Sequence, residues 1–176
     1  MINSLNRWYI LFVTGGKESG LCEYLNKQAS WKAFVPKIET PIKKDGLLTF
    51  PKKVLFPSYV FIETTMEPAA FQDNIKAIKQ RKMGIVRELK YDKGDIPSLR
   101  DEEKAYLESL LDEKKVINKS VGFIENDRVV VVDGPLVGHE SYIIKIDRHK
   151  RKAMIRMKIL SNEIEVSVPL EIIKKI

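Results

Sequence analysis

Apolar residues in the first part of the chain change between a strand-like and a helical spacing. Residues 7–13 are almost entirely apolar and predict a strand. Across residues 17–29 the apolar positions recur at helical intervals, which predicts a helix. Residues 32–41 and 51–63 then predict two strands, separated by residues 43–46, where Asp-Gly predicts a hairpin tip.

The densest run of aromatic and β-branched residues is Phe56-Pro57-Ser58-Tyr59-Val60-Phe61-Ile62-Glu63. Pro57 cannot donate a hydrogen bond to a sheet, so it predicts the start of a strand. Beyond it the side chains alternate between two apolar faces. We therefore expect one face to lie on a core and the other to be covered by a helix or by a partner.

The pattern continues with two more helices and one more strand. Apolar residues at i, i+4 and i+7 after Pro68 predict a helix that begins at this proline. Residues 83–90 predict a strand, and residues 100–114 predict a helix with acids in its first turn. The order βαββαβ followed by a helix is typical of a ferredoxin-like domain.

The helical spacing ends near residue 115. Residues 116–122 are a short polar connector, and short β-rich runs separated by turn residues follow it. Some sixty residues of this kind predict a small curled barrel. The runs are residues 127–132, 141–147, 152–159 and 163–168. The sequence therefore predicts an α+β protein with two domains, residues 1–115 and 123–176, joined by a linker at 116–122.

The bulk composition indicates a soluble protein with an anionic partner. The 176 residues are 44% hydrophobic, and no apolar run approaches the roughly 18 residues of a membrane span. A single cysteine and an N-terminus unlike a signal peptide lead us to expect a cytoplasmic protein without disulfides. The net charge of +7 favours contact with a polyanion such as nucleic acid.

The sequence contains no motif that is typical of a catalytic or metal-binding site. Gly15-Gly16-Lys17 is no phosphate loop, because position 11 is leucine and Glu18 follows the lysine. His139, His149 and the single cysteine offer no zinc-site spacing. We therefore expect neither catalysis nor a metal or other cofactor.

The strongest local signal for binding is a basic hairpin near the end of the chain. Its tip, residues 148–152, carries five basic or titratable side chains in a row, which repel one another unless an anion or water screens them. This pattern fits either a solvated turn or a loop that grips phosphates. Because Tyr142 is the only aromatic residue nearby, we expect docking to a structured RNA rather than stacking of single strands. The candidate RNA-binding residues are Lys145, Arg148, His149, Lys150, Arg151, Lys152, Arg156 and Lys158.

Four motifs together resemble the NusG family of transcription elongation factors. They are Arg7-Trp8-Tyr9, Gly16-Lys17-Glu18, Phe56-Pro57-Ser58-Tyr59-Val60-Phe61 and Asp127-Arg128-Val129 with Asp133-Gly134-Pro135-Leu136-Val137-Gly138. The resemblance covers essentially the whole chain. It implies a ferredoxin-like NGN domain, a short linker and a C-terminal, SH3-like KOW β-barrel.

The resemblance also implies what the first domain binds. In this family the NGN domain binds the clamp helices of RNA polymerase and bridges the DNA cleft. Carried over by motif, the polymerase-binding residues are Trp8, Phe56, Pro57 and Tyr59. Core packing is the alternative for each, above all for Trp8. The hairpin tip at residues 43–46 would face either the opposite side of the cleft or the DNA in it.

Two departures from the family pattern, together with the basic hairpin, favour a specialised member. Asn126 and Ser141 stand where the family usually has glycine, so we expect the β-carbon of Ser141 to be barely accommodated. The chain looks most like a paralogue of the LoaP type, a processive antiterminator. That resemblance implies a KOW domain that recognises an RNA hairpin in the nascent leader transcript. We expect a monomer that does not bind membranes.

Two alternatives remain open at this point. In the first, the protein is a general NusG-type elongation and termination factor. Its KOW domain would then bind protein partners such as Rho or a ribosomal protein. In the second, it is a structural, ribosome-associated protein built around the barrel, which would leave the first domain without a role.

Overall fold

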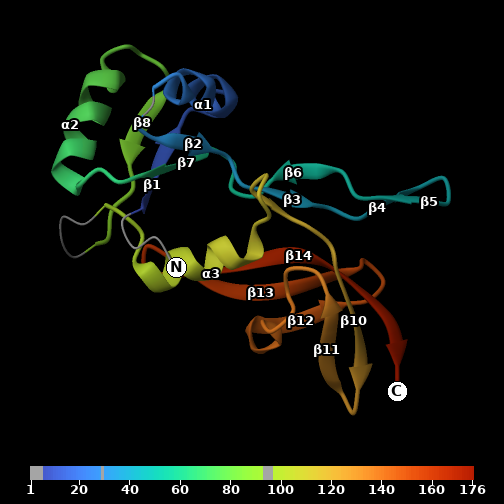
Figure 1. Cartoon of the computed structure of the whole chain (residues 1–176). Coiled ribbons are helices and arrows are strands. Elements are labelled where there is room, and N and C mark those ends of the chain that lie inside the picture. The colour runs from blue at the N-terminus through green and yellow to red at the C-terminus, as the bar shows by residue number, and fades with distance from the viewer. Residues whose placement is uncertain (1–5, 29, 93–96) are drawn as a thin grey trace. The chain divides into compact units, whose positions relative to one another are not determined.

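The computed structural model describes residues 6–28, 30–92 and 97–176, and its contacts group the chain into two compact units. The first unit consists of Met1–Val35 and Phe56–Lys104, and the second of Pro36–Leu55 and Ala105–Ile176. The arm between residues 36 and 55 thus belongs with the C-terminal part of the chain. Figure 1 labels the helices and strands of both units. No helix in the described ranges is long and apolar enough to cross a membrane.

The first unit contains a four-stranded antiparallel sheet in the order β2-β7-β1-β8. Its elements follow the predicted βαββαβ order along the chain and lead into α3 (Asp101–Leu110). The first helix ends before the predicted position 29, which lies outside the described residues. The elements are β1 (Arg7–Val13), α1 (Glu18–Asn26), β2 (Lys32–Phe34), β7 (Tyr59–Thr64), α2 (Pro68–Lys79) and β8 (Ile85–Glu88).

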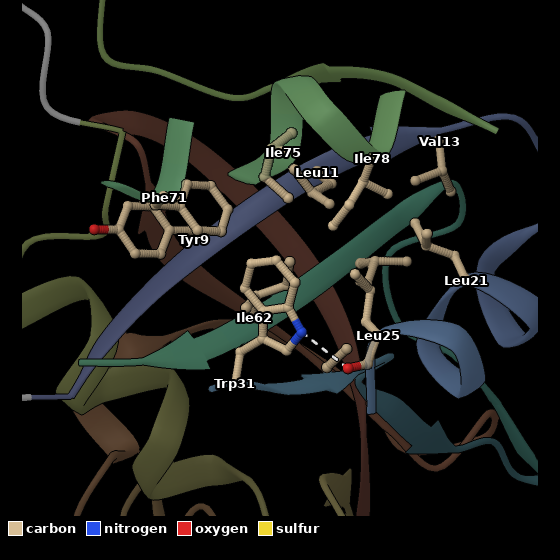
Figure 2. Packing of buried hydrophobic residues seen from close by; sticks show 12 residues of the cluster. Tyr9, Leu11, Val13, Leu21, Leu25, Trp31, Ile62, Phe71, Ile75 and Ile78 are labelled. Carbon is tan, nitrogen blue, oxygen red and sulfur yellow. Dashed lines mark hydrogen bonds between the residues drawn. The ribbon is translucent and has the colours of Figure 1, made fainter. Parts of the chain in front are cut away.

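One face of this sheet packs on α1 and α2 through a continuous apolar core. Figure 2 shows the rings of Tyr9 and Phe71 lying over each other, and their centroids are 3.8 Å apart. The indole N–H of Trp31 donates a hydrogen bond of 2.8 Å to the carbonyl oxygen of Leu25. These contacts join β1, both helices and the segment before β2 into one core, as the alternating pattern predicted for one face.

The arm of the second unit, residues 36–55, is broken into short strands. The sequence predicted two continuous strands here, at 32–41 and 51–63, and this prediction was wrong. Apart from the Asp45-Gly46 turn between β4 and β5, each break lies at a proline, which lacks the amide proton that a ladder needs. Pro36, Pro41 and Pro51 interrupt the arm. The short strands are β3 (Lys37–Glu39), β4 (Ile42–Lys44), β5 (Leu47–Thr49) and β6 (Lys52–Val54).

Residues 116–122, expected to be a polar connector, carry strands instead. They contain β9 (Val116–Ile117) and the start of β10 (Ser120–Glu125), and β9 pairs in parallel with β3. The Asp112 carboxylate orders the approach by accepting hydrogen bonds from the amides of Lys114 and Val116. Burial opposes ionisation of Asp112, but the hydrogen bonds from Asn118 and these amides outweigh it and lower its pKa. The segment is thus an ordered connection between α3 and the five-stranded sheet of the second unit.

The rest of the second unit is a five-stranded sheet in the order β11-β10-β14-β13-β12. Its 14-residue strand β14 pairs antiparallel with β13 through its first part and parallel with β10 through its last part. Strands β11 and β12 are therefore the two edges. The remaining elements are β11 (Arg128–Asp133), the short 3₁₀ helix η1 (Glu140–Tyr142), β12 (Ile143–Asp147), β13 (Lys152–Ile159) and β14 (Asn162–Lys175).

Asn126 and Ser141, which stand where the family usually has glycine, differ in their backbone conformation. Asn126 and Asp127 form the two-residue turn between β10 and β11, with φ of 48° and 59°. Both angles are left-handed, which asparagine and aspartate tolerate better than most residues. The expectation of a crowded Ser141 was wrong, because this residue is exposed and its φ lies outside the left-handed region. Glycine is required instead at Gly134, where a β-carbon would come within 2.5 Å of the Lys119 carbonyl oxygen.

Replacing Phe71 by alanine should destabilise the first unit by about 3–5 kcal/mol, since it empties the centre of the core. Urea unfolding followed by helical circular dichroism measures the change. Val86→Ala serves as the control, because Val86 lies on β8 of the same sheet and is 46% exposed. Equal unfolding midpoints for the two variants would contradict this account of the core.

Candidate protein-docking and nucleic-acid interfaces

The turn from Phe56 to Tyr59 is fixed by hydrogen bonds from two neighbouring elements. The Tyr59 amide donates to the Phe56 carbonyl at 3.2 Å, which closes the turn. Ser58 has a left-handed φ of 67°, a conformation that costs an L-residue about 1–2 kcal/mol. Its carbonyl accepts from the amide of Val13 at 2.8 Å, and its amide donates to Glu18 Oε1 at 2.9 Å. The end of β1 and the start of α1 thus hold the turn in place.

Hydrogen bonding also sets the ionisation of Glu18. The amides of Glu18 itself, Ser58 and Gly16 hold the pKa of this carboxyl below its ordinary value, against a smaller opposing effect of burial. The carboxylate is therefore charged at neutral pH and accepts from Ser58 continuously. Glu18 belongs to the Gly16-Lys17-Glu18 motif, but its contact with Ser58 could not be predicted, because the two residues lie forty positions apart.

The face of the sheet opposite the helices is an aromatic face, comprising Trp8, Phe12, Phe34, Phe56, Tyr59 and Phe61. The Trp8 and Phe34 centroids are 5.1 Å apart, and Phe34 and Phe56 both stack on Phe61, at 5.6 and 5.9 Å. At the other end Tyr59 packs against Phe12 at 5.6 Å. Such aromatic pairs contribute energy beyond their buried area.

The structure separates the four predicted polymerase-binding residues by exposure. Trp8 has an exposed fraction of 0%, and its indole N–H donates to Glu63 Oε2 at 2.7 Å. This burial fits the core-packing alternative for Trp8. Phe56 and Tyr59 are half-buried, and Pro57 between them is exposed. The turn therefore presents a compact aromatic and proline surface, and the docking role of these residues stays a prediction.

The predicted basic residues of the barrel do not form one uniform surface. Arg156 Nε lies 2.9 Å from Glu163 Oε1, and a second guanidinium nitrogen lies 3.8 Å from Glu165. Lys158 stands directly opposite Glu163 in the β13–β14 register. Arg151 is 4.0 Å from Glu171. Acids on β14 thus offset the charge along β13, and a phosphate would have to compete with them.

Several basic side chains at the turn between β12 and β13 are not paired with an acid in the described ranges. The amide of Lys150 donates to Asp147 Oδ1 at 2.9 Å, which caps the turn, while its ammonium lies 4.0 Å from Asp147 Oδ2. Lys145, Arg148 and His149 are exposed and make no ion pair or side-chain hydrogen bond with any residue in the described ranges. We call Lys145, Arg148, His149 and Lys150 the turn cluster.

A hollow of about 520 Å³ opens beside this turn. It is lined by Lys145, Arg148 and His149 of the turn cluster, by Asp147, and by Ile146 and Ile172. The two isoleucines are half-buried, so the hollow joins a cationic rim to an apolar wall. Ile172 was missed at the sequence level because β14 was expected to end at residue 168.

A second basic surface lies on the arm. Its five lysines, Lys37, Lys43, Lys44, Lys52 and Lys53, are all exposed, against the two acids Glu39 and Asp45. Glu39 is engaged, because its Oε2 accepts from the Lys119 amide at 2.7 Å. Leu47, near the predicted tip at 43–46, is 67% exposed. Exposed lysines beside an exposed apolar side chain suit contact with a partner rather than core packing.

Other reactive groups give no sign of chemistry. Burial and then the nearby Glu18 charge raise the pKa of the Cys22 thiol to about 11, so the thiol stays protonated at neutral pH. Cys22 packs against the core of the first unit. Within the ranges that the structure describes, no three His, Cys, Asp or Glu side chains gather as metal ligands would.

Comparison with known proteins gives a consistent result. The family model described as transcription termination factor NusG matches residues 6–108. The transcription termination/antitermination protein NusG of Bacillus subtilis is 24% identical over 96% of this chain and 98% of its own length. The Thermus thermophilus protein of the same name is 23% identical over 92% of this chain and 94% of its length.

Because the family model covers more than half of the chain, the protein belongs to the NusG family. A mixed α/β unit followed by a β-rich C-terminal part agrees with this assignment. Its relatives are named as transcription termination and antitermination proteins.

Replacing Glu18 by alanine should speed hydrogen exchange of the Ser58 amide by about tenfold, since the amide loses a charged acceptor. In the wild type the same protection should persist above the ordinary glutamate pKa and be lost as the pH falls through the lowered pKa of Glu18. Amide exchange measured by NMR at several pH values tests both points. Glu23→Ala, an exposed change later in α1, is the matched control. An unchanged Ser58 exchange rate in Glu18→Ala would show that the contact does not hold the turn.

Proposed function

We propose that this NusG-family protein regulates transcription elongation as a processive antiterminator of the LoaP type. Its first unit would act as an NGN domain that binds the clamp helices of RNA polymerase. Its barrel would act as a KOW domain that binds an RNA hairpin in the nascent leader transcript. The protein would act by binding rather than catalysis, as a monomer in the cytoplasm.

The topology supports this domain assignment. The sheet order β2-β7-β1-β8 with two helices on one face is the order of a ferredoxin-like domain. The strongly bent five-stranded sheet of the second unit, in which β14 serves two neighbours, supports an SH3-like barrel. The arm lysines and Leu47 provide a surface for DNA in the polymerase cleft or for the opposite side of that cleft.

The observation that carries the RNA proposal is the contrast along the basic hairpin. Arg156 and Arg151 have acidic partners, whereas Lys145, Arg148 and His149 have none in the described ranges. Uncompensated cations on one turn are stabilised by a bound polyanion, and RNA phosphates provide one. The RNA-binding residues are therefore those of the turn cluster, with Lys152, Arg151, Arg156 and Lys158 in lesser roles.

A general NusG-type function is the second candidate. The barrel exposes Val132, Val137 and Ile144, and a hollow lined by Val129, Ile143 and Ile144 separates the edge strands β11 and β12. Exposed apolar residues at open strand edges suit a protein partner. Rho or a ribosomal protein would be that partner.

The double variant Lys145→Ala, Arg148→Ala should bind structured leader RNAs more weakly than the wild type. Because two phosphate contacts are lost, the slope of log affinity against log salt should fall by about two. The matched control is Arg156→Ala, Lys158→Ala, which removes the same charge from compensated positions. Filter binding across a salt series, with scrambled RNA controls, gives both slopes.

If both double variants lose affinity equally, the turn is not the binding element and only net charge matters. If neither changes binding while a barrel-dependent pull-down retains Rho or a ribosomal protein, the general NusG function replaces the antiterminator.

Polymerase binding tests the first unit separately. Phe56→Ala should weaken binding to RNA polymerase by about tenfold or more, as for an anchor residue of an interface. Val86→Ala, on the same sheet and 46% exposed, should leave binding unchanged. Biolayer interferometry with purified polymerase measures both. Equal affinities for the two variants would remove the aromatic turn from the docking surface.

A further inference from the structure

The hollow beside the basic turn combines three features, of which phosphate binding alone requires only the first. It has a basic rim at Lys145, Arg148 and His149, an apolar wall at Ile146 and Ile172, and a volume of about 520 Å³. This volume falls in the range of small-ligand pockets, roughly 300–1,000 Å³. A surface that only gripped a helical backbone would need the charges but neither the hollow nor the isoleucines.

An apolar wall favours a ligand group that has an accessible apolar surface, such as the face of a base. In a paired RNA stem the base faces are stacked, and the deep, narrow major groove keeps side chains out. An unpaired nucleotide can be splayed out, so that its base faces become accessible and its phosphate remains attached. The combined rim and wall therefore match a nucleotide outside the stem better than one within it.

The one acid of the hollow does not oppose this assignment. Asp147 Oδ1 already accepts from the Lys150 amide at 2.9 Å, and its second oxygen lies 4.0 Å from the Lys150 ammonium. Both of its oxygens are thus directed toward Lys150 within the turn. The three rim residues have no such partner in the part of the chain that the structure describes.

We propose that this hollow accepts one unpaired nucleotide of an RNA stem-loop, with the base against Ile146 and Ile172 and the phosphate against Lys145, Arg148 and His149. The proposal rests on the proposed RNA-binding function and adds to it the element that the RNA must carry. Such a nucleotide distinguishes one hairpin from another, which contacts to phosphates alone cannot do.

The test uses the full chain and two RNA stem-loops that share stem and loop. One carries a single bulged 2-aminopurine and the other is fully paired. The wild type should bind the bulged RNA about tenfold more tightly and change its fluorescence. Ile172→Phe fills the hollow without changing charge, and should abolish both effects while keeping affinity for the paired RNA.

Ile173→Phe is the matched control, because the neighbouring residue on β14 is 65% exposed and does not line the hollow. It should behave as the wild type does. Acrylamide quenching of the bulged base in the wild-type complex gives a readout that needs no variant to fold. Protection of the base supports the proposal, and quenching equal to that of free RNA overturns it.

The outcomes separate this inference from the function on which it rests. If both RNAs bind equally and Arg148→Ala weakens both, the barrel binds RNA but the hollow holds no nucleotide. If neither RNA binds and an acidic peptide does, the RNA function fails and the nucleotide site fails with it.

Discussion

The antiparallel pairing of β1 with β7 is the constraint on which the first unit depends. Its register places Tyr9 opposite Ile62 and Ile10 opposite Phe61, so each strand presents one row of side chains to the helices and one to the aromatic face. A slip by one residue would exchange the two rows, so that the core residues would face away from the helices and the aromatic residues would face them. The hydrogen bonds of Ser58, at the end of this pairing, fix the register and the Phe56–Tyr59 turn together. The packing of the core and the position of this turn thus depend on the same pairing of β1 with β7.

The fold of the first unit could be predicted because its signals are local. The spacing after Pro68 and the alternation after Pro57 each specify one element without reference to distant residues. The arm and the connector could not be predicted in this way. Each proline was assigned to a longer strand, although its missing amide ends the ladder there. Strand β9 has two residues and exists only because β3, nearly eighty positions earlier, pairs with it.

The candidate sites, too, could be predicted from the sequence only where they depend on local residues. The run of basic residues at 148–152 is visible in the sequence, but its compensation is not, since Glu163 and Glu165 approach Arg156 only through the β13–β14 ladder. The sequence therefore overstates the cationic surface at one end of the hairpin. The isoleucine wall could not be found either, because Ile172 reaches the turn only through the length of β14. Charge can be read from composition, whereas the cancellation of charge depends on topology.

The double use of β14 has a consequence for the order in which the five-stranded sheet forms during synthesis. The hairpin of β12 and β13 is local and can form as soon as it emerges from the ribosome. The parallel pairing of Ser120 with Leu170 joins residues fifty positions apart and must wait for the last segment of the chain. Glu163 and Glu165 follow Arg156 within the local β13–β14 hairpin, so they can pair with it early, whereas Ile172 joins the hollow only when the last part of β14 is in place. A nascent chain therefore presents the basic turn before the apolar wall of the hollow exists.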